Sequence, residues 1–337
     1  GLARRRSPES KAVPSLSVIS GTHGCHRRRR LLVAVVLAIV MLAALPGCVP
    51  PPKRCTRSCP PSAEVVALWK AVARMVVFSG NGAWVDVYDW SPTFTRGAAS
   101  FGPADVDVLA DRGVQVLYIQ TSRWNVPDDV LDPALLRSIV ARAHARKVRV
   151  VGWYLPAFAD LTTDLRRFAA MRTVGVDGIA VDIEDTSTAL DLRNERLVWL
   201  SALLRWWLPD TPLAAIVLPP VVTDVINTRY WPGFPWERLA PLYDVWMPMS
   251  YWTNRTPESG YRDAYRYTAE NIDRLRSNLR RPKAVVSVVG GIADAVTPAD
   301  VVAFERAARE RGAIGGSLYD ARTSAPELWE QMLVFRR

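Results

Sequence analysis

Residues 177–185 read DGIAVDIED, a predicted strand with acidic side chains at two alternate positions, Asp182 and Glu184. Because side chains alternate along a strand, both carboxyl groups share one face, while Ile179, Val181 and Ile183 share the other. Two carboxyl groups this close do not both ionise freely, so one pKa rises and that group holds a proton near neutral pH. Glu184 comes last and projects furthest, which makes it the candidate general acid.

The alternative role for these carboxyl groups is a buried salt bridge. The predicted strands contain almost no basic residue, however, and Arg149 lies only near the start of one. We therefore expect the pair to face a cleft.

Other catalytic chemistries lack the residues they need. The region after residue 60 has one histidine, His144, inside the helical segment ARAHARK, and all four cysteines precede residue 60. A Ser-His-Asp triad, a Cys-His pair and a His-ligated metal site are therefore not expected. Since no phosphate-binding loop is present either, we expect neither a cofactor nor a metal.

The elements that position the acidic pair alternate regularly between strand and helix. Helix starts are marked by Asp132-Pro133 and Thr297-Pro298, and helix ends by Gly113, Gly175 and Gly312. Eight alternating strands in about 250 residues predict an α/β fold of the (β/α)8 barrel type. The predicted strands are Trp84–Asp89, Val114–Thr121, Val148–Leu155, Gly178–Glu184, Leu213–Leu218, Asp244–Tyr251, Ala284–Val289 and Ile314–Tyr319.

In such a barrel the active site lies at the C-terminal ends of the strands, where this sequence becomes polar and aromatic. The alternative is that these strand ends are simply solvated. The candidate substrate-binding residues at these ends are Asp86, Tyr118, Gln120, Tyr154, Trp252, Tyr319 and Asp320.

Tryptophans also gather at strand ends, and flat sugar faces stack on such rings. We expect three or four of these to face a ligand: Trp84, Trp90, Trp124, Trp153, Trp231, Trp236, Trp246 and Trp252. We expect the helical tryptophans to serve packing: Trp199, Trp206, Trp207 and Trp329.

DGIAVDIE resembles the DGxDxDxE signature on the fourth strand of family 18 glycoside hydrolases, the chitinases and their relatives. Met249-Ser250-Tyr251 is similar to the family's Met-x-Tyr on the sixth strand. The resemblance implies that Glu184 protonates the glycosidic oxygen, while the substrate's own N-acetyl group attacks the anomeric carbon. Asp182 would orient that acetamide and Tyr251 would donate a hydrogen bond to it.

The sequence departs from the family pattern at three positions. Ala180 replaces an inner Asp, Ile183 replaces a Trp, and Tyr319 replaces the usual Trp at the floor of the site. Asp86 together with the Asp182-x-Glu184 pair is also weakly similar to family 25 lysozymes, which cut peptidoglycan.

Both resemblances imply a glycoside hydrolase whose substrate is an N-acetylhexosamine-containing polysaccharide, either chitin-like or peptidoglycan. The alternative is a catalytically inactive barrel that binds glycans, and Ala180 favours it.

The N-terminal region has the order of a secretory signal: the basic block Arg27–Arg30, the apolar run Leu31–Leu45, and Leu45-Pro46-Gly47-Cys48. The last four residues resemble the bacterial lipobox, which implies lipidation of Cys48. We expect a leader (1–47), a Pro-rich, lipid-anchored tether (48–75) and the barrel (76–337). The protein would then lie outside the cytoplasm, held at the outer face of the cell membrane by its lipid, or be secreted if the signal is an ordinary cleaved one.

The net charge of +10 does not indicate nucleic-acid binding. Residues 1–62 carry eleven basic residues and one acidic residue, so basic and acidic side chains balance in the remainder. A neutral barrel lacks the basic surface that nucleic acid requires.

Overall fold

The computed structural model describes residues 62–97 and 99–335. They contain eight strands: β1 (Gly80–Val85), β2 (Val116–Gln120), β3 (Arg149–Tyr154), β4 (Gly178–Ile183), β5 (Leu213–Val217), β6 (Val245–Pro248), β7 (Ser287–Ile292) and β8 (Gly315–Tyr319). Neighbouring strands pair in parallel from β1 to β6 and from β7 through β8 back to β1. Bridges from Trp246 to Val286 and from Met249 to Val289 connect β6 to β7 and close the sheet. The predicted (β/α)8 barrel is confirmed.

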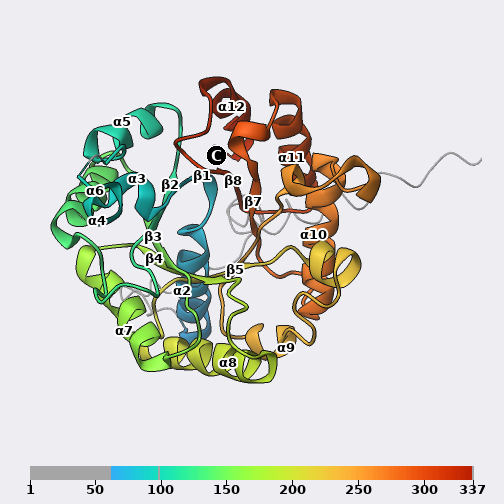
Figure 1. Cartoon of the computed structure of the whole chain (residues 1–337), viewed down its shortest axis with the longest axis horizontal. Helices are drawn as coiled ribbons and strands as arrows, with labels where there is room; N and C mark the ends of the chain where they lie inside the picture. The colour runs from blue at the N-terminus through green and yellow to red at the C-terminus, as the bar shows by residue number, and fades with distance from the viewer. Residues whose placement is uncertain (1–61, 98, 336–337) are drawn as a thin grey trace, which may run out of the picture. The chain divides into compact units, whose positions relative to one another are not determined.

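Most of the helices surround the strands as a ring (Figure 1). Their bounds are α2 (Ala63–Val76), α3 (Val87–Trp90), α4 (Pro92–Thr95), α5 (Pro103–Asp111), α6 (Pro133–Ala145), α7 (Leu161–Met171), α8 (Leu190–Trp207), α9 (Trp236–Leu239), α10 (Ala264–Asn278), α11 (Pro298–Glu310) and α12 (Pro326–Gln331). In the described part of the chain, no helix is long and apolar enough to cross a membrane.

The predicted helix boundaries follow from local chemistry. Thr297 caps α11, because its hydroxyl accepts the Asp300 N–H while the Asp300 carboxylate accepts the Thr297 N–H. Gly113, Gly175 and Gly312 have φ values of +84°, +86° and +64°, a conformation that favours glycine after a helix.

The first strand lies four residues earlier than predicted, so Asp86 follows the strand instead of lying within it. β1 ends at Val85, and the next residues form the helical turn α3. Asp86 caps this turn by accepting the Tyr88 N–H at 2.7 Å. Its carboxylate is thereby held at the mouth of the barrel. The seventh strand likewise lies three residues later than predicted.

The residues from Pro61 to Arg337 form one compact unit that contains the closed sheet and its hydrophobic core, as expected of a part that folds by itself. The end of the predicted tether is helical rather than extended, since α2 begins at Ala63 and Ser62 caps it by accepting the Val65 N–H. The expected leader and the rest of the tether, including Cys48, lie outside the described residues.

Candidate active site

A cavity of about 320 Å³ opens at the C-terminal ends of the strands, the end that carries the active site in (β/α)8 barrels. It is lined by Trp84, Asp86, Tyr88, Gln120, Arg123, Trp124, Trp153, Leu155, Asp182, Glu184, Ile216, Met249, Tyr251, Ile292 and Tyr319.

The acidic pair of β4 faces this cavity. Asp182 lies within the strand and is 6% exposed, and Glu184 directly follows the strand and is half-buried. Val181 and Ile183, which alternate with the acidic residues, are fully buried. The alternation predicted from the sequence therefore holds, and it brings both carboxyl groups to one site.

Burial raises the pKa of the Asp182 carboxyl well above its ordinary value of 3.8, and the charge of Glu184 raises that pKa further. Burial also raises the pKa of Glu184 above its ordinary value of 4.5, with the charge of Asp185 as the second cause. No basic side chain is among these causes, so the pair differs from a buried salt bridge. Two such groups titrate together and retain a proton at higher pH than an exposed carboxyl would.

Tyr251 reaches the cavity from the loop after β6. Its ring lies 6.2 Å from the ring of Tyr319, centroid to centroid. Burial raises the pKa of the Tyr251 hydroxyl, and the charge of Asp182 is the second cause. The hydroxyl therefore stays protonated and can donate a hydrogen bond into the cavity.

Asp86 and Tyr319 form a second polar pair at the mouth. The Tyr319 hydroxyl donates to the Asp86 carboxylate at 3.1 Å, and both side chains line the cavity. Burial raises the pKa of Asp86, while the hydrogen bond from Tyr319 opposes that shift. Asp86 therefore lines the same cavity as the β4 pair.

Three acidic side chains, Asp86, Asp89 and Asp320, place carboxylate oxygens within 4.8 Å of one another. Burial, followed by the charge of Asp86, raises the pKa of Asp89 to about 6. Arg322 forms an ion pair with Asp89 at 3.0 Å. Since a cation of the chain itself already offsets this charge, we assign no metal to the cluster.

Three of the eight strand-end tryptophans, Trp84, Trp124 and Trp153, line the cavity. Trp84 stacks on Tyr118 with the ring centroids 4.4 Å apart, and its indole N–H donates to Ser317 at 2.8 Å. Trp124 is 52% exposed at the rim. These rings offer flat apolar faces at two depths of the cavity.

Four of the seven residues predicted to contact substrate do not line the cavity, and three of them are held elsewhere by packing or hydrogen bonds. Tyr118 is buried below Trp84, and its hydroxyl is directed to the Phe78 carbonyl oxygen at the opposite end of the barrel. Tyr154 faces outward and donates a hydrogen bond to Asp164 in α7 at 2.6 Å. Trp252 is fully buried against Phe304, with ring centroids 5.5 Å apart.

Gln120 lines the cavity, but its side-chain oxygen accepts the Val87 N–H at 3.2 Å and thereby supports the turn after β1. Asp320 is not among the residues that line the cavity, and its carboxylate accepts hydrogen bonds from the backbone N–H and hydroxyl of Thr323 at 2.9 Å each. Arg123 was not predicted; it follows β2, lines the cavity and lies over the rings of Tyr88 and Phe94.

The four tryptophans on helices differ in their exposure, although all of them were predicted to serve packing. Trp329 is buried and serves packing, but Trp199, Trp206 and Trp207 in α8 are 59%, 79% and 52% exposed. The packing role predicted for these three is therefore wrong.

Asp182→Asn should raise the free energy of unfolding at pH 7 by about 0.5–2 kcal/mol. The pKa of Asp182 is higher in the folded than in the unfolded chain. The stability of the wild type therefore declines as the pH rises from the pKa of Asp182 in the unfolded chain toward its pKa in the folded chain. The gain should therefore vanish near pH 3, where both states are protonated. Denaturant unfolding at both pH values measures it, with the exposed Asp128→Asn as control; an unchanged or lowered stability at pH 7 would contradict the prediction.

No protein-family model and no curated protein matches this sequence. Solved structures do match the fold. A family GH18 chitinase from Cycas revoluta, in complex with allosamidin, superposes with a TM-score of 0.57 at 12% identity, covering 77% of this chain and 100% of that one. The spore cortex-lytic enzyme SleL of Bacillus cereus gives a TM-score of 0.56 at 11% identity, covering 76% and 73%.

A chitinase from Chromobacterium violaceum gives a TM-score of 0.53 at 12% identity, covering 77% of this chain and 99% of that one. At these identities the similarity concerns the fold. The described chain is thus a (β/α)8 barrel similar to those of GH18 chitinases and of the spore cortex-lytic enzyme SleL.

Proposed function

We propose that this protein is a glycoside hydrolase that acts on an N-acetylhexosamine-containing glycan, with Glu184 as general acid. The observation that carries the proposal is the β4 pair: two carboxyl groups with raised pKa values line one cavity at the mouth of the barrel. Tyr251 and three tryptophans in the same cavity add a hydrogen-bond donor and flat apolar faces for a sugar. The similarity of the barrel to those of chitinases and SleL supports the same reading.

In the proposed reaction, the carbonyl oxygen of the substrate's acetamide forms a bond to the anomeric carbon as the glycosidic bond breaks. The proton of Glu184 passes to the departing glycosidic oxygen. In the pair that holds one proton, on Glu184, the Asp182 carboxylate stabilises the positive charge that develops on the acetamide group, and Tyr251 fixes the orientation of that group by a hydrogen bond. Water then attacks the anomeric carbon, its proton returns to Glu184, and the acetamide is restored.

Asp182 fits this role because its Oδ1 atom makes no hydrogen bond to the described protein although it is buried. A buried polar atom without a partner is costly, and a bound acetamide N–H would supply one.

The glycan could be neutral, as chitin is, or carry carboxylates, as peptidoglycan does. The charged side chains that line the cavity are three carboxylates (Asp86, Asp182 and Glu184) and Arg123, which is half-buried and lies over aromatic rings. This guanidinium could pair with a carboxylate of a cell-wall glycan, so both substrates belong in the assay.

The test is the release of reducing ends by the purified protein from chitin oligomers and from peptidoglycan, with cellulose oligomers as a control that lacks N-acetyl groups. Cleavage of at least one N-acetylated substrate, and not of cellulose, is expected. Cleavage of none of them contradicts the proposal.

A second candidate function is a catalytically inactive glycan-binding barrel. Ala180, buried in β4 next to Trp153 of β3, favours it, because an Asp at this position would sit one layer below Asp182. Binding of chitin oligomers or muropeptides without turnover, unchanged in Glu184→Gln, would support this function instead.

We also propose that the protein is exported and anchored through a lipid on Cys48, on the basis of the segment Leu31–Leu45 and the Leu-Pro-Gly-Cys sequence. Cys48→Ala should move the protein from the membrane fraction to the medium or leave the precursor unprocessed, because the lipid acceptor is lost. Cell fractionation and the apparent mass on a gel measure both effects. Cys55→Ala is the matched control and should leave both unchanged; unaltered processing and membrane retention in Cys48→Ala would refute the proposal.

A further inference from the structure

The helix α2 has an apolar face that nothing in the described chain covers. Its residues Val65, Leu68, Trp69, Val72 and Val76 recur at helical spacing and are 39–62% exposed. We call these five residues the α2 stripe.

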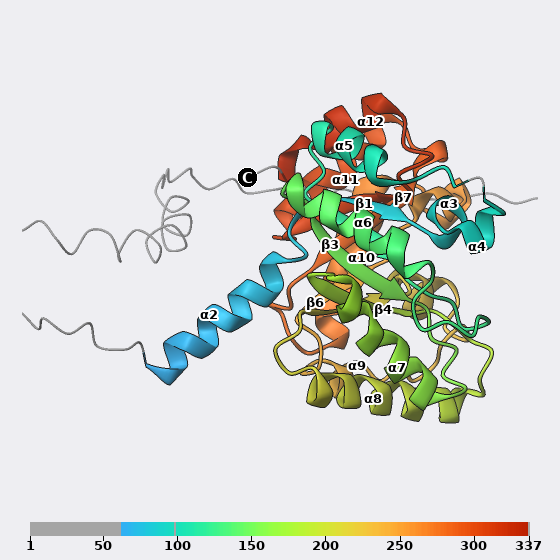
Figure 2. The same ribbon diagram turned by 90° about the vertical axis from the view of Figure 1, so that its left-hand side faces the viewer.

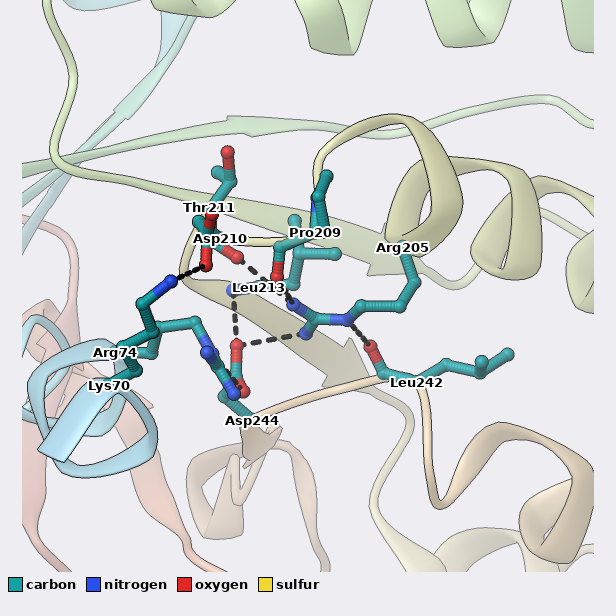
Figure 3. A network of polar contacts seen from close by, with 9 residues as sticks. All are labelled: Lys70, Arg74, Arg205, Pro209, Asp210, Thr211, Leu213, Leu242 and Asp244. Carbon is teal, nitrogen blue, oxygen red and sulfur yellow. Dashed lines mark hydrogen bonds and ion pairs between the residues drawn. The ribbon is translucent and has the colours of Figure 1, made fainter. Parts of the chain in front are cut away.

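The opposite face of α2 is fixed to the barrel by ion pairs (Figure 3). Arg74 Nε donates to Asp244 Oδ1 at 2.9 Å, and Lys70 Nζ to Asp210 Oδ1 at 3.1 Å. Asp244 is well buried and also accepts from Arg205 at 2.9 Å and from the Leu213 N–H at 3.0 Å. Because Arg74 lies about 200° around the helix from Val72, this network turns the α2 stripe away from the barrel.

Basic and aromatic side chains flank α2. Arg281 and Lys283, in the connection between α10 and β7, are exposed and share with Arg74 the lining of one hollow of about 470 Å³. Trp206 and Trp207, in the last turn of α8, are 79% and 52% exposed and precede Asp210 by only a few residues. An apolar stripe with neighbouring cations and tryptophans has the composition of a surface that binds an anionic bilayer.

This surface lies at the end of the barrel opposite the cavity. Asp210 lies three residues before β5 and Asp244 directly before β6, so α2 is attached at the N-terminal ends of the strands. Figure 2 shows α2 projecting on one side of the barrel, with α3 and α4, which follow β1, on the other.

We infer that the α2 stripe lies in the interface of an anionic lipid bilayer and, with Arg281 and Lys283, orients the barrel so that its cavity faces away from the membrane. The 14 residues of α2 extend about 21 Å, too short to span a hydrocarbon core of about 30 Å, so the helix lies on the bilayer. Fourteen residues separate Cys48 from Ala63 and reach at most about 50 Å, so an anchor at Cys48 would keep α2 near the surface. The inference concerns this face alone and is independent of the chemistry of Glu184.

The test uses the unit from Pro61 to Arg337, with its fold verified by a cooperative thermal transition, so that residues 31–45 do not bind lipid themselves. Flotation with vesicles of phosphatidylcholine containing 30% phosphatidylglycerol measures binding, and pure phosphatidylcholine vesicles measure the contribution of lipid charge. Leu68→Gln/Trp69→Gln should weaken binding by at least about tenfold, because two apolar side chains leave the interface. Val108→Gln/Val302→Gln, which alters apolar residues on α5 and α11 that are 47% and 51% exposed, is the control and should bind like the wild type.

Arg281→Gln and Lys283→Gln should each weaken binding to the anionic vesicles by about fivefold and leave binding to neutral vesicles unchanged. Failure of the wild type to bind either vesicle, or equal binding by Leu68→Gln/Trp69→Gln, overturns the inference. So does a concentration-dependent dimer, measured by analytical ultracentrifugation, that this double substitution abolishes, because a second copy would then cover the α2 stripe.

Discussion

Glu184→Gln is expected to lower the turnover rate on N-acetylated oligomers by about 10²–10⁴-fold, the usual contribution of general acid–base catalysis. The amide keeps the shape of the side chain but has no acidic proton for the glycosidic oxygen. Binding of the oligomer should persist, so the loss should appear in kcat rather than KM. Release of reducing ends under saturating substrate measures the effect, and an unchanged thermal transition shows that the fold is intact.

The pH profile tests the same assignment. Because burial raises the pKa of Glu184, the protonated, active form persists above its ordinary value, and activity should fall as pH rises through the raised pKa. Asp185→Asn is the matched control, since the charge of Asp185 also raises that pKa and its side chain does not line the cavity. This variant should keep its maximal rate but lose activity at lower pH than the wild type. A Glu184→Gln protein with wild-type turnover would refute the role of Glu184.

The barrel and the β4 pair could be predicted from the sequence because both depend on local pattern. Apolar runs of strand length alternate with capped helices, and alternation within a strand fixes which side chains share a face. Asp182 and Glu184 therefore reached the cavity as expected, and Tyr251 lies beside them.

The individual aromatic contacts could not be predicted in the same way. Trp153 and Tyr154 are adjacent in β3, and only one of them can face the barrel axis. The structure turns Tyr154 outward, where Asp164 and Arg167 of α7 bind its hydroxyl at 2.6 and 2.8 Å. Those partners come from a different element, so the sequence of β3 alone does not indicate which of the two side chains faces outward.

The prediction that Tyr118 contacts substrate was wrong because of the depth of its side chain in the barrel, not because of the face of the strand on which it lies. Tyr118 stacks under Trp84, the side chain that lines the cavity above it. Helix α2 was not predicted because a Pro-rich sequence precedes it. Ser62 is nevertheless a typical N-cap residue, and residues 63–76 contain neither Gly nor Pro, as is typical of a helix.

Substitution of Asp182 tests whether the substrate's own acetamide takes part in the reaction. Asp182→Asn should lower turnover on N-acetylated oligomers by about 10²–10³-fold, as expected when a group that stabilises developing charge is neutralised. Removal of the acetyl groups from the substrate should lower the wild-type rate by a similar factor, because the same interaction is then missing.

The decisive comparison combines Asp182→Asn with removal of the acetyl groups from the substrate. If Asp182 acts through the acetamide, Asp182→Asn should have no further effect on de-N-acetylated oligomers, since each change alone already removes the interaction. Asp86→Asn, which alters another acidic side chain of the cavity, is the parallel variant and should lower turnover by the same factor on both substrates. Equal losses for Asp182→Asn on both substrates would contradict acetamide participation and favour a lysozyme-like site, in which the carboxylates act on the sugar ring directly.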